Sequence, residues 1–258
     1  MEQKKQQVTI QSVERAMAIL ELLCRSQKPL SVAEISEAVG LKRTTVYGLL
    51  NTLIELDYVA DSDMNNRYEI TSKMYRLSYS YPERIPVVRY ARTYMLQLSE
   101  RFDSVVHLGI LNQSNDVMLI YAQMPTSTQN ARSGSLFPLH ATGLGKTLLA
   151  FLPEEKADVI IDDLDFQPFT RHTITDPDAL RSELANIRVQ GYARDNSEYI
   201  EQSACVAFPI FEADGSIAAA LSITSSPEFI GQNFEAIVAH GLAASKNCSI
   251  DMGWQIYR

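Results

Sequence analysis

The spacing of apolar positions between residues 30 and 59 predicts two helices joined by a tight turn. Ser31 is placed to cap the first helix, and Glu34 three residues later completes a capping box. Gly40 tolerates a positive φ and is expected to end that helix. The second helix is expected to begin near Lys42. Its apolar residues recur at helical intervals, at Val46, Leu49, Leu50, Leu53 and Ile54. Two short helices with a glycine in the turn predict a helix-turn-helix.

The outer face of the second predicted helix carries polar side chains, which we interpret as a DNA-contacting surface. A recognition helix presents its N-terminal residues to base edges, and basic and hydroxyl side chains bond bases and phosphates. The residues of this helix that we expect to contact DNA are Lys42, Arg43, Thr44, Thr45, Tyr47 and Asn51. The alternative is a plain amphipathic helix pair, because such pairs are common in proteins that never bind nucleic acid.

A β-hairpin is expected directly after the second helix. Tyr58–Ala60 and Arg67–Thr71 have strand composition, and residues 61–66 between them are typical of a turn. A hairpin in this position is the wing of a winged helix-turn-helix. We expect Arg67 at the tip of this wing, placed to reach a phosphate or a minor groove.

Three more helices are expected around this unit. Residues 12–24 predict an N-terminal helix, and residues 72–81 predict a short one. The apolar stripe expected on the N-terminal helix is Val13, Ala16, Met17, Leu20 and Leu23. Residues 87–102 predict a longer helix. Its expected apolar side is Val88, Ala91, Met95 and Leu98.

The length of 258 residues favours two domains, and the prolines at 82 and 86 mark the joint between them. We expect a DNA-binding domain over residues 1–80, a linker helix over 81–103 and a second domain over 104–258.

The second domain is predicted to be α+β, with an antiparallel sheet flanked by helices. The strands are expected at residues 105–111, 117–124, 205–211 and 216–224. The helices are expected to start near Gly143 and Pro153, to run from Asp176 to Gly191, and to cover Pro227 to Asp251 as one final helix.

Composition excludes some classes of protein. The sequence has no apolar run of about 18 residues, so no membrane-spanning helix is expected, and its N-terminus lacks the apolar segment of a signal peptide. The three cysteines have no paired spacing, which suits a reducing cytoplasm. Residues 1–80 hold 10 basic and 10 acidic residues. The remaining 13 basic and 21 acidic residues therefore give residues 81–258 the whole net charge of −8.

The segment Gly143-Leu144-Gly145-Lys146-Thr147 is similar to the end of a P-loop. That motif requires a glycine five residues before Gly145, and the sequence has His140 there. An NTPase is therefore rejected. A glycine-bearing loop at a helix N-terminus still offers backbone N–H groups and a favourable dipole to an anion. A ligand carboxylate fits such a site, and glycines that serve only the entry into the helix are the alternative.

A catalytic nucleophile at Cys205 would need a histidine within reach. The four histidines are scattered through the sequence and form no signature with the cysteine. A metal site also lacks ligand spacing, so no cofactor is expected. The polar residues better suited to holding a ligand are Asp195, Glu198, Cys205, Ser222 and Thr224. Ser222 and Thr224 share one face of a strand by the period-two rule.

Several stretches, in order along the chain, resemble the IclR family of bacterial transcription regulators. They are Ser12–Ala16, Gly40–Tyr47, Pro138–Lys146, Gly191–Ala193 with Asp195, Cys205–Ala207 with Pro209–Phe211, and Ala220–Ile223. The resemblance implies a winged helix-turn-helix, a linker helix and a GAF-like effector-binding domain, working as a homodimer or homotetramer. It also implies small organic acids and related metabolites as effectors. The effector-binding positions that it implies are Ala141, Thr142, Gly143, Leu144, Asp195, Cys205, Ser222 and Thr224.

The expected function is a ligand-responsive regulator that binds double-stranded DNA and represses a catabolic operon. A small amidase or hydrolase fused to a DNA-binding domain is the alternative. The sequence departs from the family pattern at three positions. Gly48 stands where many members have arginine or histidine, Gln202 replaces a glycine usual shortly before the cysteine, and Thr224 stands where serine is frequent.

Overall fold

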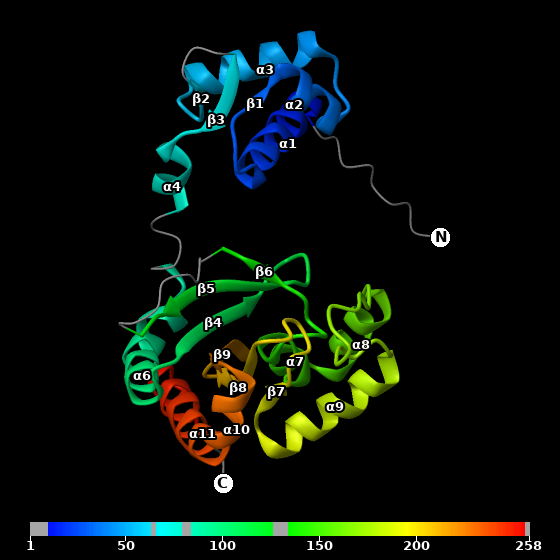
Figure 1. Ribbon diagram of the computed structural model, residues 1–258. Coiled ribbons are helices and arrows are strands. Elements are labelled where there is room, and N and C mark those ends of the chain that lie inside the picture. Colours follow the sequence, from blue (N-terminus) through cyan, green and yellow to red (C-terminus); the bar gives the residue numbers. More distant parts are fainter. Residues whose placement is uncertain (1–9, 63–65, 79–83, 126–133, 256–258) are drawn as a thin grey trace. The chain divides into compact units, whose positions relative to one another are not determined.

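The computed structural model describes residues 10–62, 66–78, 84–125 and 134–255. The chain divides into two compact units, residues 1–81 and residues 82–258 (Figure 1). Each unit has its own core, and each is described by itself.

The first unit is a winged helix-turn-helix. Its helices are α1 (Gln11–Arg25), α2 (Val32–Val39), α3 (Arg43–Glu55) and α4 (Ser72–Ser78). Its strands are β1 (Leu30–Ser31), β2 (Val59–Ser62) and β3 (Arg67–Ile70), which pair antiparallel in the order β1-β3-β2. The predicted caps are confirmed. Ser31 and Glu34 form a capping box, and Gly40 ends α2 with φ of 65°. Strand β1 was not predicted from the sequence, because two residues carry no readable alternation.

The buried side of α1 differs from the predicted stripe. Val13 and Met17 are about half exposed (55% and 48%), whereas Ile19, Leu20 and Leu23 are buried. Helix α1 has apolar residues on two adjacent stripes, and either stripe could face the core. Packing against α2 and α3 buries the stripe that contains Ile19. The apolar stripe of α3 was predicted correctly, with Val46, Leu50 and Leu53 buried.

The second unit is built on a six-stranded antiparallel sheet in the order β6-β5-β4-β9-β8-β7. The strands are β4 (Val105–Leu111), β5 (Val117–Gln123), β6 (Leu136–Phe137), β7 (Ala193–Asp195), β8 (Ala204–Phe211) and β9 (Ile217–Ser225). The helices are α6 (Pro86–Phe102), α7 (Gly143–Ala150), α8 (Glu154–Asp163), α9 (Pro177–Gln190), α10 (Pro227–Gln232) and α11 (Phe234–Asp251). The predicted α+β class is confirmed, and no described helix is long and apolar enough to cross a membrane.

Helices cover both faces of this sheet (Figure 1). On one face, α6 and α11 bury a core with residues such as Met95, Leu108, Phe208 and Leu221. On the other face, α7, α8 and α9 bury a second core that includes Leu148, Ile161, Leu184 and Ala207. Helix α6, the expected linker helix, therefore packs into the second unit.

The final helix is broken, which corrects the prediction of one helix from Pro227 to Asp251. Asn233 ends α10 with φ of −109° and ψ of 11°, and α11 begins at the next residue. The Asn233 side-chain amide donates to the carbonyl of Phe229 at 3.0 Å. Asparagine bonds its local backbone in this way more readily than it continues a helix.

The contact between α11 and β8 gives a test of the packing. A Cβ on Gly241 would overlap the ring of Phe208, so Gly241→Ala is expected to lower the free energy of unfolding by about 1–3 kcal/mol through overpacking. Gly231→Ala in α10 is the matched control, because nothing lies within 4 Å of its Cβ position. Urea unfolding midpoints measure both variants. An equal effect of the two substitutions would contradict the packing.

Candidate functional site

The exposed face of α3 carries most of the polar residues that the sequence assigns to DNA. Lys42, Arg43, Thr44, Tyr47 and Asn51 are exposed, and Thr45 is half-buried. Arg43, Thr44 and Tyr47 share a shallow hollow with Asn66 and Tyr68 from the wing. The recognition helix and the wing thus form one continuous surface within this unit.

The start of α3 also suits a phosphate. Its first turn holds no acidic residue, and the N-cap Lys42 makes no side-chain cap bond. The first N–H groups of a helix then face solvent at the positive end of the helix dipole. Backbone donors and basic side chains are the groups that bond phosphate oxygens.

Arg67 lies next to the turn of the wing and is exposed, as expected, but its side chain is already bonded within this unit. It begins β3 and is paired with Ser31 of β1 and Ser62 of β2. Its Nη1 donates to the carbonyl of Pro29 at 3.0 Å and to Glu34 Oε2 at 3.2 Å. Part of the guanidinium therefore ties the wing to the start of α2, a long-range contact that no local sequence pattern signals.

A cavity of about 290 Å³ lies in the second unit. Strands β4, β8 and β9, the start of α7 and the loop after β7 supply its walls. Six of the eight expected effector-binding residues line it, namely Thr142, Leu144, Asp195, Cys205, Ser222 and Thr224. Ala141 and Gly143 are buried beside it and are not among the lining residues.

Sequence reasoning missed the other lining residues. These are His107, Leu119, Ser135, Phe137, Tyr199, Ile200 and Ser203. His107 is a polar residue within the otherwise apolar strand β4, and this pattern could have indicated it. Its partner across the sheet is Ser222, which also lines the cavity. The remaining residues come from the neighbouring strands and from the loop after β7, which only the folded chain brings together.

Strand register explains how the polar groups meet. Thr224 on β9 pairs with Cys205 on β8, and Cys205 pairs in turn with Asp195 on β7. On the other side, His107 Nδ1 lies 3.1 Å from Thr224 Oγ1. Burial lowers the pKa of His107 to about 4, so its imidazole is neutral at neutral pH. The lining of the cavity is mostly apolar, with hydroxyl groups and a neutral imidazole as its uncharged polar groups.

Asp195 is the carboxyl group of this cavity. Burial raises its pKa to about 7, against the hydrogen bonds from the backbone of Glu198 and Tyr199 that lower it. The Glu198 N–H donates to Asp195 Oδ1 at 2.7 Å. None of the described residues that line the cavity is lysine or arginine. Near neutral pH, Asp195 can thus act as either a donor or an acceptor.

The glycine loop offers fewer free N–H groups than the sequence suggests. Gly145 N–H donates to Thr142 Oγ1 at 3.1 Å, and the backbone of Gly143 bonds Cys205. Thr142 and Leu144, at the start of α7, line the cavity. The N-terminus of α7, where the helix dipole favours an anion, therefore borders the cavity.

Cys205 lacks the features of a nucleophile. Burial raises the pKa of its thiol far above the ordinary value, and the charge of Asp195 adds to this. A nucleophilic cysteine needs a lowered pKa and a base beside it. Of the bonds made by the described histidines, none reaches Cys205, and no described cluster of residues could hold a metal ion.

Comparison with known proteins gives consistent matches along the chain. Residues 12–62 match the IclR helix-turn-helix domain, and residues 79–249 match the family described as bacterial transcriptional regulator IclR C-terminal. The chain is 32% identical to the HTH-type transcriptional regulator KdgR of Dickeya chrysanthemi, over 98% of this chain and 83% of that protein.

Solved structures share the fold. The IclR protein of Thermotoga maritima is 26% identical, with a TM-score of 0.77 over 95% of this chain and 100% of that one. An IclR homologue from Microbacterium hydrocarbonoxydans, complexed with 4-hydroxybenzoate, is 21% identical, with a TM-score of 0.78 over 93% of this chain and 98% of that one.

The raised pKa of Asp195 predicts a pH dependence of stability. The folded chain keeps the proton up to about pH 7, whereas the unfolded chain releases it near pH 4. Stability contributed by this group is therefore full at low pH and is lost as pH rises toward 7. Between pH 5 and 7 the wild type should lose about 1 kcal/mol per pH unit relative to Asp195→Asn.

Urea unfolding at pH 5, 6, 7 and 8 measures this difference. The asparagine keeps an acceptor for the Glu198 N–H but has no proton to lose, so every other titrating group cancels between the two proteins. A difference that stays constant over this range would show that Asp195 is ionised throughout.

Proposed function

The chain belongs to the IclR family of bacterial transcription regulators, and we propose that it represses a catabolic operon in response to a small organic acid. In this proposal, residues 1–80 bind operator DNA, residues 81–103 link the two parts, and residues 104–258 bind the effector. The protein is a regulator and not an enzyme, and the cytoplasm is its proposed location.

The proposed DNA contacts are Lys42, Arg43, Thr44, Thr45, Tyr47, Asn51 and Arg67. The exposed face of α3 and the acid-free start of that helix support them. The Nη1 of Arg67 already donates to Pro29 and Glu34. A phosphate would therefore have to accept from the other N–H groups of the Arg67 guanidinium. A single recognition helix covers little DNA, so we propose a homodimer or homotetramer that reads half-sites about one helical turn apart.

The proposed effector site is the cavity beside α7, with contacts from Ala141, Thr142, Gly143, Leu144, Asp195, Cys205, Ser222 and Thr224. The observation that carries this proposal is that six of these residues, remote in sequence, line one cavity. A volume of about 290 Å³ suits a small metabolite.

The chemistry of the cavity favours a small hydroxy- or oxo-acid. The N-terminus of α7, which borders the cavity at Thr142 and Leu144, and the hydroxyls of Ser222 and Thr224 are suited to a carboxylate. Protonated Asp195 adds a donor, and ionised Asp195 would accept from a ligand hydroxyl. The homologue solved with 4-hydroxybenzoate, which is both an acid and a hydroxyl compound, supports this class of ligand. A polyphosphate would crowd negative charge against Asp195.

Arg43 provides the test of the DNA surface. Arg43→Ala should weaken operator binding by about 1–3 kcal/mol if the guanidinium reads a base, and the loss should be smaller on non-specific DNA. Lys156→Ala, an exposed lysine on α8 in the other unit, is the control for a simple loss of charge. Gel-shift titrations on operator and scrambled DNA measure both. Operator affinity that Arg43→Ala leaves intact would remove this residue from the interface.

Ser222 provides the test of the effector site. Its side chain is buried (1% exposed) and lines the cavity, so Ser222→Ala should weaken the bound acid about tenfold by removing one hydrogen bond. Operator affinity without the acid should stay unchanged. Ser216→Ala, at the exposed hairpin turn, is the matched control.

Calorimetry with a panel of small hydroxy- and oxo-acids, 4-hydroxybenzoate among them, measures the effect. If the variant binds the active acid as tightly as the wild type does, Ser222 is outside the site. If no acid of the panel binds the wild type at millimolar concentration, the proposal of an acidic effector is wrong.

A further inference from the structure

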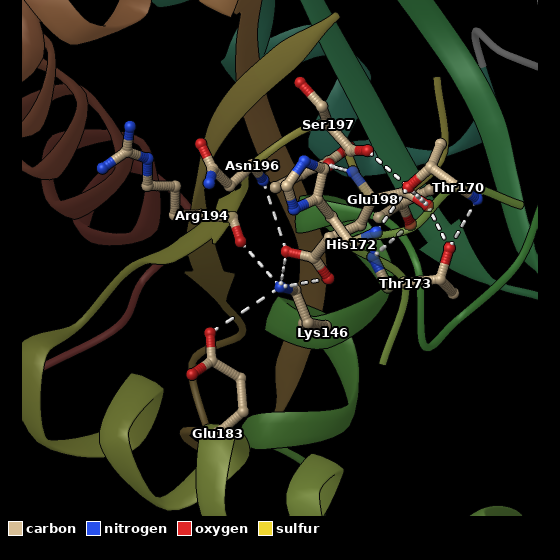
Figure 2. Close-up of polar contacts among 12 residues, drawn as sticks. Lys146, Thr170, His172, Thr173, Glu183, Arg194, Asn196, Ser197 and Glu198 are labelled. Carbon is tan, nitrogen blue, oxygen red and sulfur yellow. Dashed lines mark hydrogen bonds and ion pairs between the residues drawn. The ribbon is translucent and has the colours of Figure 1, made fainter. Parts of the chain in front are cut away.

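Lys146 is a fully buried lysine in the motif that resembles the end of a P-loop. Its side chain is 1% exposed, and its Nζ donates to Glu198 Oε1 at 2.6 Å, to Glu198 Oε2 at 2.8 Å and to the carbonyl of Arg194 at 2.7 Å (Figure 2). Glu183 of α9 lies farther away, at 3.7 Å. An ammonium group has three donors, and these acceptors engage them.

This lysine is not a ligand-binding group. It is absent from the residues that line the cavity, and the Glu198 carboxylate neutralises its charge. The P-loop lysine binds phosphate because its charge points into the loop. Here the side chain runs to the backbone of β7 and to the loop that follows it (Figure 2).

The loop held by Lys146 forms one wall of the cavity. Residues 196–203 follow Asp195, and Tyr199, Ile200 and Ser203 line the cavity. Within the loop, Asn196 N–H donates to Glu198 Oε1 at 3.3 Å. Glu198 N–H donates to Asp195 Oδ1. The ion pair thus fixes the turn that orients both Asp195 and the wall.

A second set of bonds holds this turn from the other side. Thr170 Oγ1 donates to the carbonyl of Ser197 at 2.7 Å, and Thr173 Oγ1 donates to the carbonyl of Glu198 at 2.6 Å (Figure 2). Ser197 itself has a positive φ of 61°, a conformation that costs a non-glycine residue free energy. In the loop after β7, the two threonines bond backbone carbonyls and do not reach the Glu198 carboxylate. Lys146 and the Asn196 N–H hold that carboxylate, and Lys146 is the charged group of the two.

Stability alone is a poor reason for a buried ion pair. Removing two charges from water costs several kcal/mol, and apolar residues of similar volume often stabilise a protein equally well. A hydrogen-bonded ammonium group holds its acceptors at defined positions. A pair of apolar side chains makes no such directional bonds.

We propose that Lys146 is the positioning residue of the effector site: by pairing with Glu198 and the Arg194 carbonyl, it holds residues 196–203 as the closed wall of the cavity and sets the orientation of Asp195. The effector role of the cavity rests on the proposed function. The positioning of the wall does not, and its test needs neither effector nor DNA.

Hydrogen exchange measured by mass spectrometry tests the position of the wall. Lys146→Met leaves a buried carboxylate without its partner, and this variant alone could be poorly folded. The double variant Lys146→Met with Glu198→Met removes both charges and keeps apolar volume, so its global unfolding should stay close to that of the wild type. In the double variant, amides of residues 196–203 should exchange at least about tenfold faster than in the wild type.

The matched control is Arg181→Met, which breaks another ion network. Arg181 pairs with Asp158, Asp162 and Asp178 on α8 and α9. This variant should speed exchange near those helices and leave residues 196–203 unchanged. Wild-type exchange at residues 196–203 in a folded double variant would overturn the proposal, because the pair would then be dispensable for the wall.

Alkylation of Cys205 by iodoacetamide gives an independent measurement. Cys205 is buried (6% exposed) and lines the cavity, so a loosened wall should raise its rate of alkylation about tenfold. The exposed Cys24 is replaced by serine in every protein compared. If Cys205 reacts at the wild-type rate in both Lys146 variants, the wall does not depend on Lys146. Hydrogen exchange and Cys205 alkylation need no effector, so they test the role of Lys146 even if no acid of the panel binds. The proposal of an acidic effector and the proposal for Lys146 can therefore fail independently.

Discussion

The effector cavity depends on how closely the start of α7 approaches the sheet. A Cβ at Gly143 would lie 2.6 Å from the sulfur of Cys205, and a Cβ at Gly145 would overlap the backbone of Leu139. Only glycine permits both approaches. Because the helix sits so close, Leu144 reaches the cavity and Lys146 reaches the loop after β7. The glycines that resemble a phosphate-binding loop thus serve the packing of a helix against strands and against its own entry loop.

The same sheet gathers groups that are far apart in sequence. The order β4-β9-β8-β7 places His107, Thr224, Cys205 and Asp195 in successive strands across the cavity. Burial shifts the pKa values of the imidazole, the thiol and the carboxyl group. It keeps the imidazole neutral, suppresses the thiolate and leaves the carboxyl near its midpoint at neutral pH. Such a site can hold a small polar molecule, and the buried thiol offers it no nucleophile.

Features specified by neighbouring residues could be predicted from the sequence. The capping box at Ser31, the turn at Gly40 and the four long strands of the large sheet, β4, β5, β8 and β9, follow from local patterns. Residue chemistry singled out Asp195, Cys205, Ser222 and Thr224, and the family resemblance added Ala141, Thr142, Gly143 and Leu144. Six of these eight residues line the cavity. Features set by distant contacts were missed. The buried side of α1, the tie between Arg67 and Glu34, the short strands β1, β6 and β7, and the place of His107 all depend on tertiary neighbours. The GAF-like description and the contacts with DNA remain predictions.

In the proposed function, binding of an acid in the cavity of the second unit changes the DNA affinity of the first. The most direct test is to measure the affinity of the active acid for the free protein and for the protein saturated with operator DNA. Coupling between two sites is reciprocal. The affinities for the acid with and without operator should therefore differ by the same factor by which the acid changes operator affinity. Equal affinities with and without operator would contradict this coupling.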